Sequence, residues 1–282
     1  MSVIKVNNIT SRDGTTGPVI AGIATVSTTS HLVVPTGNTG QKVPLAPDPF
    51  INNLVLALPF NSESVFDDVS PKSKGTFSGR GSIGFATTTA SLPFGVSGVT
   101  TTSVGIVTFS KYYGTSVGFN TSISSTQALQ NNNTSDYQFG IDDFTIEFWI
   151  YIKNFSHSFF PLIIKCSDDS SWNNGWSLSL RSTGTIYWRS NSDNWTTTST
   201  YSTNIWYHIA VVRKNLTRSL YVNGILERSD YDSNSLVPTT QISIGNDISS
   251  NYPLDGYLQD LRIYKGVAKY TSNFTPPTQI AL

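Results

Sequence analysis

Carboxylates and imidazoles are the side chains that most often do acid–base chemistry, and this sequence holds few of them in useful combinations. Hydrolysis of a glycosidic bond uses two carboxyl groups placed on either side of that bond. The three glutamates, Glu63, Glu147 and Glu227, lie far apart, so we expect a structural hydrogen-bonding role for Glu147. No histidine has a second histidine or cysteine at metal-ligand spacing, and we expect His208 to be a packed residue. The sequence therefore predicts a protein without catalytic machinery.

Sugar binding needs other residues, namely exposed aromatic rings beside amide and hydroxyl groups. Two predicted loops offer this combination, one with Trp172 and Asn173 and the other with Asp193 and Trp195. Because Ser, Asn and Thr residues surround Trp195, we expect its ring to be exposed, and we take these four residues as ligand-binding candidates. The alternative is that the tryptophans fill contacts between subunits, where tryptophan is also enriched. Trp176 precedes alternating leucines and is expected in the core.

Charge and cysteine content limit the partners and the compartment. The 282 residues carry 18 basic and 18 acidic side chains. No basic cluster occurs, which argues against nucleic-acid binding, and a neutral surface suits assembly. Cys166 is the single cysteine and is expected to be buried, so no intrachain disulfide forms, which fits synthesis inside a cell. The first residues show no apolar signal-peptide region, and no run is long enough for membrane insertion as a helix.

The elements that must position these residues are β-strands. Short apolar runs alternate with Gly, Asn, Ser and Thr turns, and helical patterns are almost absent. Residues 144–152 place apolar side chains on one face and a mixed set, including Glu147 and Tyr151, on the other. Asn223 and Gly224 between two apolar runs predict a hairpin with a type I′ turn. We predict an all-β fold, a sandwich of two antiparallel sheets packed face to face.

The chain divides into an extended β N-terminal arm and a globular domain. Residues 1–50 hold few apolar side chains and end in a proline-rich linker, so they cannot form a core of their own. We expect them to pair with a sheet edge on another subunit or protein. The alternative is that they pack back on their own domain as extra strands. Residues 51–282 form that domain, with a Gly/Ser/Thr-rich insertion at about 78–110.

Five ordered motifs resemble the concanavalin A-like, laminin-G-type jelly roll, and the resemblance covers roughly residues 51–282. The motifs lie at 144–149, 206–213, 220–224, 244–246 and 256–264. The resemblance implies a jelly-roll sandwich without specifying a ligand, because one fold hosts many functions. It also implies that calcium could bind at one rim, with Asp68 and Asp143, each in a pair of adjacent acids, as candidates. An ordinary turn role for these acids is the alternative, and no other cofactor is expected.

A second resemblance connects the chain with virion proteins. Residues 262–277 resemble laminin-G-type modules in virion proteins of tailed phages, notably phages of marine cyanobacteria, and residues 4–17 are similar to openings of phage fibre and structural proteins. This implies a non-enzymatic structural protein, a capsid decoration or tail-fibre-like component, synthesised in the host cytoplasm and placed on the virion surface. Residues 1–50 would then bind other virion proteins within a homo-oligomer, taken as a trimer, and the jelly roll would bind host-surface glycans. The alternative is a free carbohydrate-binding lectin or adhesin module.

Overall fold

The computed structural model describes residues 48–277, apart from several internal segments. The residues outside the description are 1–47, 61–65, 74, 81–104, 108–110, 112–115, 120–126, 133–134, 156–161, 167–174, 191–192, 247–251 and 278–282. Residues 48–280 belong to one compact unit. Nearly all of the predicted arm at 1–50 and the centre of the predicted insertion at 78–110 lie outside the described residues. Within the description, no helix is long and apolar enough to cross a membrane.

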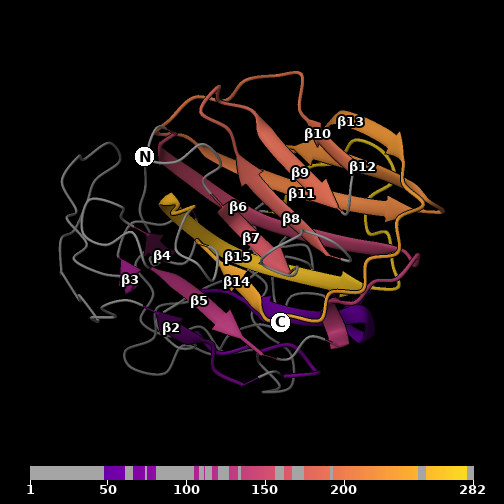
Figure 1. The fold of residues 1–282 in the computed structure, drawn as a ribbon, viewed down its shortest axis with the longest axis horizontal. Helices are drawn as coiled ribbons and strands as arrows, with labels where there is room; N and C mark the ends of the chain where they lie inside the picture. The colour runs from indigo at the N-terminus through magenta and orange to yellow at the C-terminus, as the bar shows by residue number, and fades with distance from the viewer. Residues whose placement is uncertain are drawn as a thin grey trace, which may run out of the picture. The chain divides into compact units, whose positions relative to one another are not determined.

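Two antiparallel sheets make up this unit, and one lies in front of the other in Figure 1. The eight-stranded sheet has the order β13-β12-β11-β6-β15-β4-β3, with β1 also paired to β15. The seven-stranded sheet has the order β10-β9-β8-β7-β14-β5-β2. The predicted all-β class with two antiparallel sheets is confirmed.

The bounds of β6 and of the β12–β13 hairpin agree closely with the sequence-based expectations, whereas β10 lies where a loop was expected. The eight-stranded sheet contains β1 (Leu54–Leu58), β3 (Gly105–Val107), β4 (Ser116–Phe119), β6 (Phe144–Asn154), β11 (Trp206–Lys214), β12 (Thr217–Val222), β13 (Ile225–Tyr231) and β15 (Asp255–Lys265). The seven-stranded sheet contains β2 (Ser78–Arg80), β5 (Ala128–Asn131), β7 (Leu162–Cys166), β8 (Trp176–Leu180), β9 (Ile186–Ser190), β10 (Asp193–Thr196) and β14 (Ile242–Ile244). Two short 3₁₀ turns, η1 (Ile51–Asn53) and η2 (Ser135–Tyr137), complete the described elements.

β6 is central to the eight-stranded sheet because it pairs with both β11 and β15. Its alternation places one set of side chains in the core and the other on the outer face of the sheet. The core set is Phe144, Ile146, Phe148, Ile150 and Ile152. The outer set is Thr145, Glu147, Trp149, Tyr151 and Lys153. The outer set therefore determines what this face of the sheet can bind.

Aromatic rings from both sheets fill the middle of the core. Phe144 of β6 stacks on Phe139 at 4.5 Å between ring centroids and lies 6.0 Å from Trp188 of β9. Trp176 of β8 lies 6.1 Å from Trp188, with the two rings nearly parallel. Trp176 and Cys166 are both buried, as predicted. Such ring contacts add about 0.5–1.5 kcal/mol each beyond the burial of apolar area.

The β12–β13 hairpin has the turn that the sequence predicts. Asn223 and Gly224 both adopt positive φ angles, 51° and 78°, as a type I′ turn requires. Gly224 is also constrained from outside the hairpin, because a Cβ there would lie 1.8 Å from the carbonyl oxygen of Phe274. Gly224 thus allows the positive φ angle of the hairpin turn, and its missing side chain leaves space for the backbone of Phe274.

Candidate functional site

Residues 266–277 run across the outer face of the eight-stranded sheet, and we call them the C-terminal strap. Near its start, the amide of Lys269 donates a hydrogen bond to Oγ1 of Thr145 on β6, at 2.9 Å. Further along, the amide of Phe274 donates to the carbonyl of Gly224 in the β12–β13 turn, at 2.9 Å. The strap therefore covers the part of the outer face that lies between the start of β6 and this turn.

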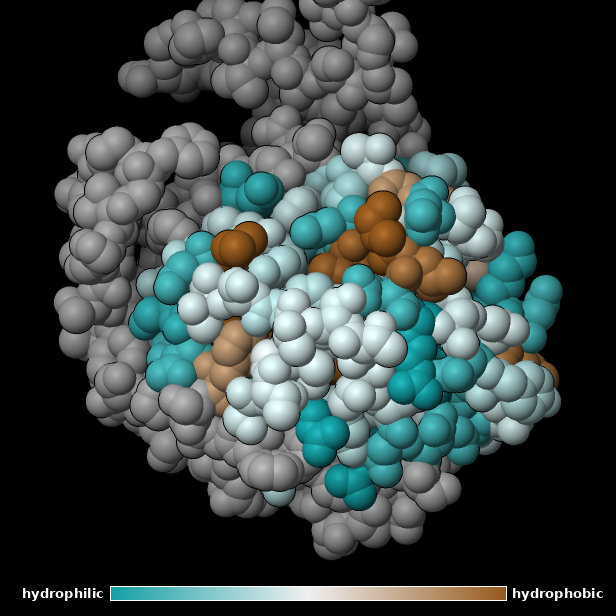
Figure 2. Space-filling model, turned by 90° about the horizontal axis from the view of Figure 1, so that it is seen from above, coloured by the Kyte–Doolittle hydropathy of each residue, from teal (hydrophilic) through white to brown (hydrophobic). Residues whose placement is uncertain are grey.

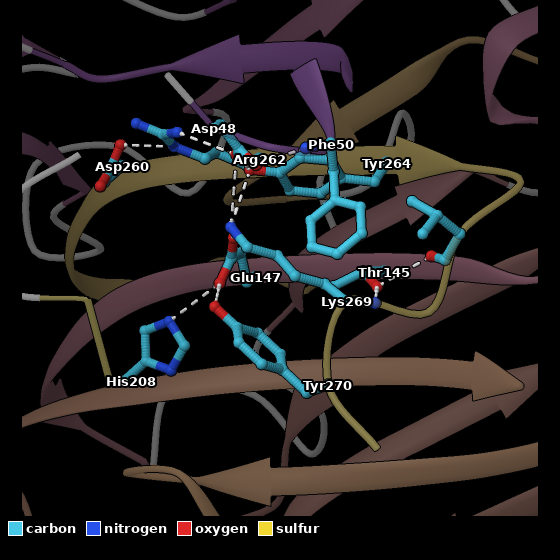
Figure 3. Close-up of polar contacts among 11 residues, drawn as sticks. Asp48, Phe50, Thr145, Glu147, His208, Asp260, Arg262, Tyr264, Lys269 and Tyr270 are labelled. Carbon is cyan, nitrogen blue, oxygen red and sulfur yellow. Dashed lines mark hydrogen bonds and ion pairs between the residues drawn. The ribbon is translucent and has the colours of Figure 1, made fainter. Parts of the chain in front are cut away.

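Glu147 of β6 is buried under the strap and holds it to the sheet (Figure 3). The Lys269 ammonium donates to Oε1 of Glu147 at 2.6 Å, and the Tyr270 hydroxyl donates to Oε2 at 2.6 Å. On the other side, Nε2 of His208 lies 3.4 Å from Oε2 of Glu147. These contacts confirm the structural role predicted for Glu147 and the packed position predicted for His208.

The same cluster reaches the first described residue of the chain. The Tyr264 hydroxyl donates to Oδ2 of Asp48 at 2.5 Å, and the Lys269 ammonium lies 3.5 Å from the same oxygen. Arg262 of β15 donates through Nε to Oδ1 of Asp260 at 3.1 Å. Asp48 and the strap thus meet on one face of β15, as Figure 3 shows.

Electrostatics make the Glu147 cluster a strong attachment. Burial alone would raise the pKa of Glu147, but the Lys269 ammonium and the contact with His208 outweigh it and hold the pKa well below its usual range. Burial, together with the Glu147 charge, raises the pKa of the Tyr270 hydroxyl, which remains a neutral donor. An ionised carboxylate with charge-assisted donors forms strong hydrogen bonds, so the cluster stabilises the strap at neutral pH.

Beyond the strap, three aromatic rings lie in a row on the same outer face. Trp206 of β11 and Tyr257 of β15 are the direct cross-strand neighbours of Tyr151 on β6. The Tyr151 ring lies 5.6 Å from the Trp206 ring and 5.8 Å from the Tyr257 ring. Trp206 and Tyr151 are only partly buried, so their rings remain accessible, whereas Tyr257 is buried, with 6% of it exposed. We call Trp206, Tyr151 and Tyr257 the aromatic row.

Polar groups flank the aromatic row. The Tyr151 hydroxyl donates to Oδ1 of Asn204 at 3.3 Å. At the other end, the Lys153 ammonium lies 5.9 Å from the centroid of the Tyr257 ring and 3.2 Å from Oδ1 of Asp255. Burial, with contributions from Asp255 and Tyr151, raises the pKa of Tyr257 to about 12. The site thus combines rings with amide, hydroxyl and ammonium groups, which suits an uncharged polyhydroxylated ligand.

A second line of side chains connects the row with the strap. Phe274 of the strap meets His208 edge-on at 5.7 Å, and His208 meets Trp149 edge-on at 5.1 Å. Trp149 is two residues from Tyr151 on the same face of β6 and lies under the Lys111 ammonium, 4.9 Å from its ring centroid. The outer face is therefore divided into a half covered by the strap and a half that carries the aromatic row.

Exposed hydrophobic residues occupy a small part of the face drawn in Figure 2. Its described residues are mostly hydrophilic or neutral, and the hydrophobic ones form small groups. Extended apolar patches are the usual mark of a protein-binding surface. The described part of this face carries one contiguous hydrophobic group and several smaller ones.

Trp195 does not lie where its polar neighbours predict. Only 4% of it is exposed, and its ring belongs to the core between the two sheets. Its guanidinium neighbours are Arg218 of β12, 4.8 Å from the ring centroid, and Arg228 of β13, at 5.1 Å. The expectation of an exposed ring is wrong because residues 193–196 form β10, and strand alternation turns Trp195 inward beside Trp188.

Of the other three ligand candidates, the structure describes only Asp193. Asp193 is a partner of Arg218, whose Nη2 donates to Oδ2 at 2.7 Å, so it links the two sheets. Trp172 and Asn173 lie outside the described residues.

The calcium candidates have turn roles. Oδ1 of Asp68 accepts hydrogen bonds from the amides of Ala57 and Ser70, both at 2.9 Å. Oδ1 of Asp143 accepts one from the amide of Asn215 at 2.8 Å. Within the described residues, no group of three or more His, Cys, Asp or Glu side chains could hold a metal ion. The contact of Asp68 with Ser70 agrees with the turn alternative, whereas Asp143 accepts its hydrogen bond from the distant turn between β11 and β12.

The sequence predicts the strands that carry the aromatic row, but it does not predict that the three rings lie side by side. Trp206 and Tyr151 lie in strands that the sequence predicts, but their neighbourhood depends on the pairing of β11 with β6 and of β6 with β15. Register is a property of the folded sheet, and no local signal in the sequence specifies it across 55 or more residues.

Comparison with known proteins agrees with this architecture. A laminin-G-type family model, described as the concanavalin A-like lectin/glucanases superfamily, matches residues 123–269, just over half of the chain. The chain therefore belongs to the concanavalin A-like lectin/glucanases superfamily. No curated protein sequence matches it.

Solved structures with the same fold differ widely in sequence. Domain 4 of a GH43 extracellular arabinanase from Geobacillus stearothermophilus, in complex with arabinotriose, has a TM-score of 0.53 at 15% identity, over 77% of this chain and 94% of that one. The binding domain of botulinum neurotoxin serotype D has a TM-score of 0.52 at 20% identity, over 78% of this chain and 49% of that one. This chain thus spans about half of the neurotoxin domain, and the likeness shows the fold alone.

The Glu147 cluster predicts a pH-dependent contribution to stability. At neutral pH, Glu147→Gln should lower the free energy of unfolding by about 3 kcal/mol, because it leaves the Lys269 ammonium without its carboxylate. The deficit relative to the unmodified protein should shrink as the pH falls below about 4.3, since the unfolded chain then binds a proton that the folded Glu147, with its lowered pKa, does not. Denaturant titration at several pH values measures this. A constant deficit across this range, or none, would contradict the assignment, and Glu227→Gln serves as a control with an effect under about 1 kcal/mol.

The buried position of Trp195 predicts a core defect on truncation. Trp195→Ala should lower the free energy of unfolding by about 3–5 kcal/mol through the cavity that it leaves. Tyr231→Ala, at a side chain that is 72% exposed, is the matched surface control and should change stability by less than about 0.5 kcal/mol. Thermal or urea denaturation of both variants measures these changes in stability. Equal stability of the two variants would place Trp195 outside the core.

Proposed function

We propose that the chain is a non-catalytic carbohydrate-binding module whose ligand lies on the aromatic row. The observation that carries this proposal is the alignment of Trp206, Tyr151 and Tyr257 across three adjacent strands, beside polar groups. Tryptophan and tyrosine rings present an apolar face and a polar edge, which matches the apolar and hydroxyl-bearing sides of a sugar ring. The buried, salt-bridged state of Glu147 supports binding without hydrolysis, because this carboxylate is committed to the strap.

The structural neighbours support the same class of ligand. The arabinanase domain is described in complex with arabinotriose, and entry of botulinum neurotoxin type C into cells is described as dependent on two ganglioside molecules. Both ligands contain carbohydrate. These proteins share the fold at low identity, so their ligands indicate a class and not a particular sugar.

Substitutions in the aromatic row test the proposal. A glycan array should first identify a ligand for the full-length protein. Trp206→Ala and Tyr151→Ala should each weaken its binding by about ten-fold or more in calorimetric titration, equivalent to about 1.4 kcal/mol, while Tyr231→Ala leaves it unchanged. Binding that survives both substitutions would remove the aromatic row as the site. The absence of any bound glycan would remove the function.

We further propose that the module works on the surface of a tailed-phage virion, attached through residues 1–50. Support comes from the resemblance of residues 4–17 and 262–277 to phage virion proteins, and from the few apolar side chains in residues 1–50. A strand-like segment that lacks a core gains both hydrogen bonds and cover from a neighbouring sheet edge. The free lectin or adhesin module is the competing proposal and needs no such attachment.

Deletion of residues 1–45 separates the two proposals. Because residues 48–280 form their own compact unit and Asp48 is retained, the shortened protein should fold and bind the same glycan. It should fail to join homo-oligomers or virions, which light scattering and purified particles can show. Normal assembly of the shortened protein, or resistance of residues 1–50 to proteolysis in the isolated monomer, would contradict the attachment role.

A further inference from the structure

β13 lies at the end of the eight-stranded sheet, where only β12 is paired with it (Figure 1). It has seven residues, whereas the other end strands of the two strand orders, β3, β10 and β2, have three or four. An end strand presents a row of backbone N–H and C=O groups to which another strand can add, and many proteins shorten or cover such strands. β13 is therefore the longest end strand in the described part of the two sheets that another segment could extend.

The ladder between β12 and β13 shows which backbone groups point away from the sheet. The amide of Asp232, directly after β13, donates to the carbonyl of Leu216, directly before β12, at 2.7 Å. Hydrogen-bonded and non-hydrogen-bonded pairs alternate along an antiparallel ladder, so every second residue back from Asp232 bonds to β12. Ser229 and Tyr231 lie between these residues, and their N–H and C=O groups therefore point outward, toward the open edge.

Only the first part of this edge is covered by another described segment. The outward amide of Leu226 donates to Oδ1 of Asn273 in the strap, at 2.9 Å. Beyond it, no described strand pairs with the outer side of β13. Three of the seven exposed large hydrophobic side chains among the described residues also lie on this strand, namely Ile225, Leu226 and Tyr231, which are 53%, 45% and 72% exposed. Exposed apolar surface beside unpaired backbone favours the addition of a strand.

The open part of β13 carries a different set of side chains on each face. Arg228 and Asp230 point to the opposite face from Ser229 and Tyr231. Nε of Arg228 donates to Oδ2 of Asp230 at 2.5 Å, and the two side chains are 36% and 38% exposed. A matching strand would place a cation opposite Asp230 and an apolar residue opposite Tyr231.

We propose that the open edge of β13 receives the N-terminal arm of a second copy of this chain. Residues 1–47 precede the described structure and span up to about 150 Å when fully extended, which is enough to reach a neighbouring copy. The contact joins two different surfaces, so the copies associate head to tail and can close into a ring such as a trimer. The β13 site rests on the attachment role proposed for residues 1–50 and adds the surface to which they attach.

The start of the arm fits this edge in an antiparallel register with a cation opposite the acid and an aliphatic residue opposite the ring. In this register Lys5 lies opposite Asp230. Its neighbour Ile4 then lies opposite Tyr231. A shift of the arm by two residues in one direction would place Lys5 opposite Arg228, where like charges repel. The charges and the apolar side chains thus favour the same register.

Edge-blocking and charge-swap variants of the full-length protein test the proposal by analytical ultracentrifugation. Ser229→Pro removes an outward N–H donor that β12 does not use, so it should convert the oligomer into folded monomers. Asp230→Lys and Lys5→Asp should each weaken association about ten-fold or more, whereas the variant with both substitutions should recover it. Asp67→Lys, at an exposed acid in the turn after β1, is the matched control and should leave association unchanged.

The outcomes separate the β13 site from the attachment role of residues 1–50. If deletion of residues 1–45 abolishes the oligomer while Ser229→Pro and the charge variants leave it intact, the arm binds elsewhere, and the attachment role stands without the β13 site. If Ser229→Pro abolishes an oligomer that the deletion leaves intact, β13 pairs with β13 of another copy and the arm is not its occupant. A full-length protein that is monomeric at every concentration tested would also overturn the proposal. Circular dichroism confirms that each variant is folded, and Asp230→Lys covers the case in which Ser229→Pro fails to fold.

Discussion

A buried carboxylate organises one whole face of this protein. Glu147 is inaccessible to solvent, so its charge is stable only with the donors of Lys269 and Tyr270 in place. Both donors come from the C-terminal strap, and the chain must therefore cross the outer face of β6 to satisfy the carboxylate. Where the strap ends, the outer face carries the aromatic row, in which Trp206 and Tyr151 are partly buried and Tyr257 is buried. The burial of the Glu147 carboxylate thus explains why the strap covers one half of the outer face of the eight-stranded sheet.

The two sheets have different surfaces because their strands alternate different residues against a shared core. In the eight-stranded sheet, the outward residues of β6 are large and partly aromatic. In the seven-stranded sheet, the outward residues are hydroxyl, amide and cationic side chains, and the single acid of its strands points to Arg218. Stacked rings of Phe144, Trp176 and Trp188 hold the sheets together. A fold of this kind can present two unlike surfaces without a deep cavity.

Sequence reasoning recovers the fold well and the site poorly, for a physical reason. Period-two alternation and the Asn223-Gly224 turn are local signals, and they predicted β6, β11 and the hairpin correctly. The polar neighbours of Trp195 suggest a loop, whereas Asn194 and Thr196 are the outward residues of the alternating strand β10. The aromatic row arises from register between distant strands, and the Glu147 cluster arises from the path of the strap. Neither register nor chain path has a local signature.

We propose that the part of the eight-stranded sheet beyond the strap binds a glycan through the partly exposed rings of Trp206 and Tyr151, beside the buried Tyr257. The most direct measurement follows the aromatic NMR signals of these residues while a glycan identified by array is added. The account predicts graded shifts of the Trp206 and Tyr151 signals, and of Tyr257 beside them, with no shifts of the core rings Trp176 and Trp188. Shifts confined to residues elsewhere, with the aromatic row unchanged at saturating glycan, would contradict it.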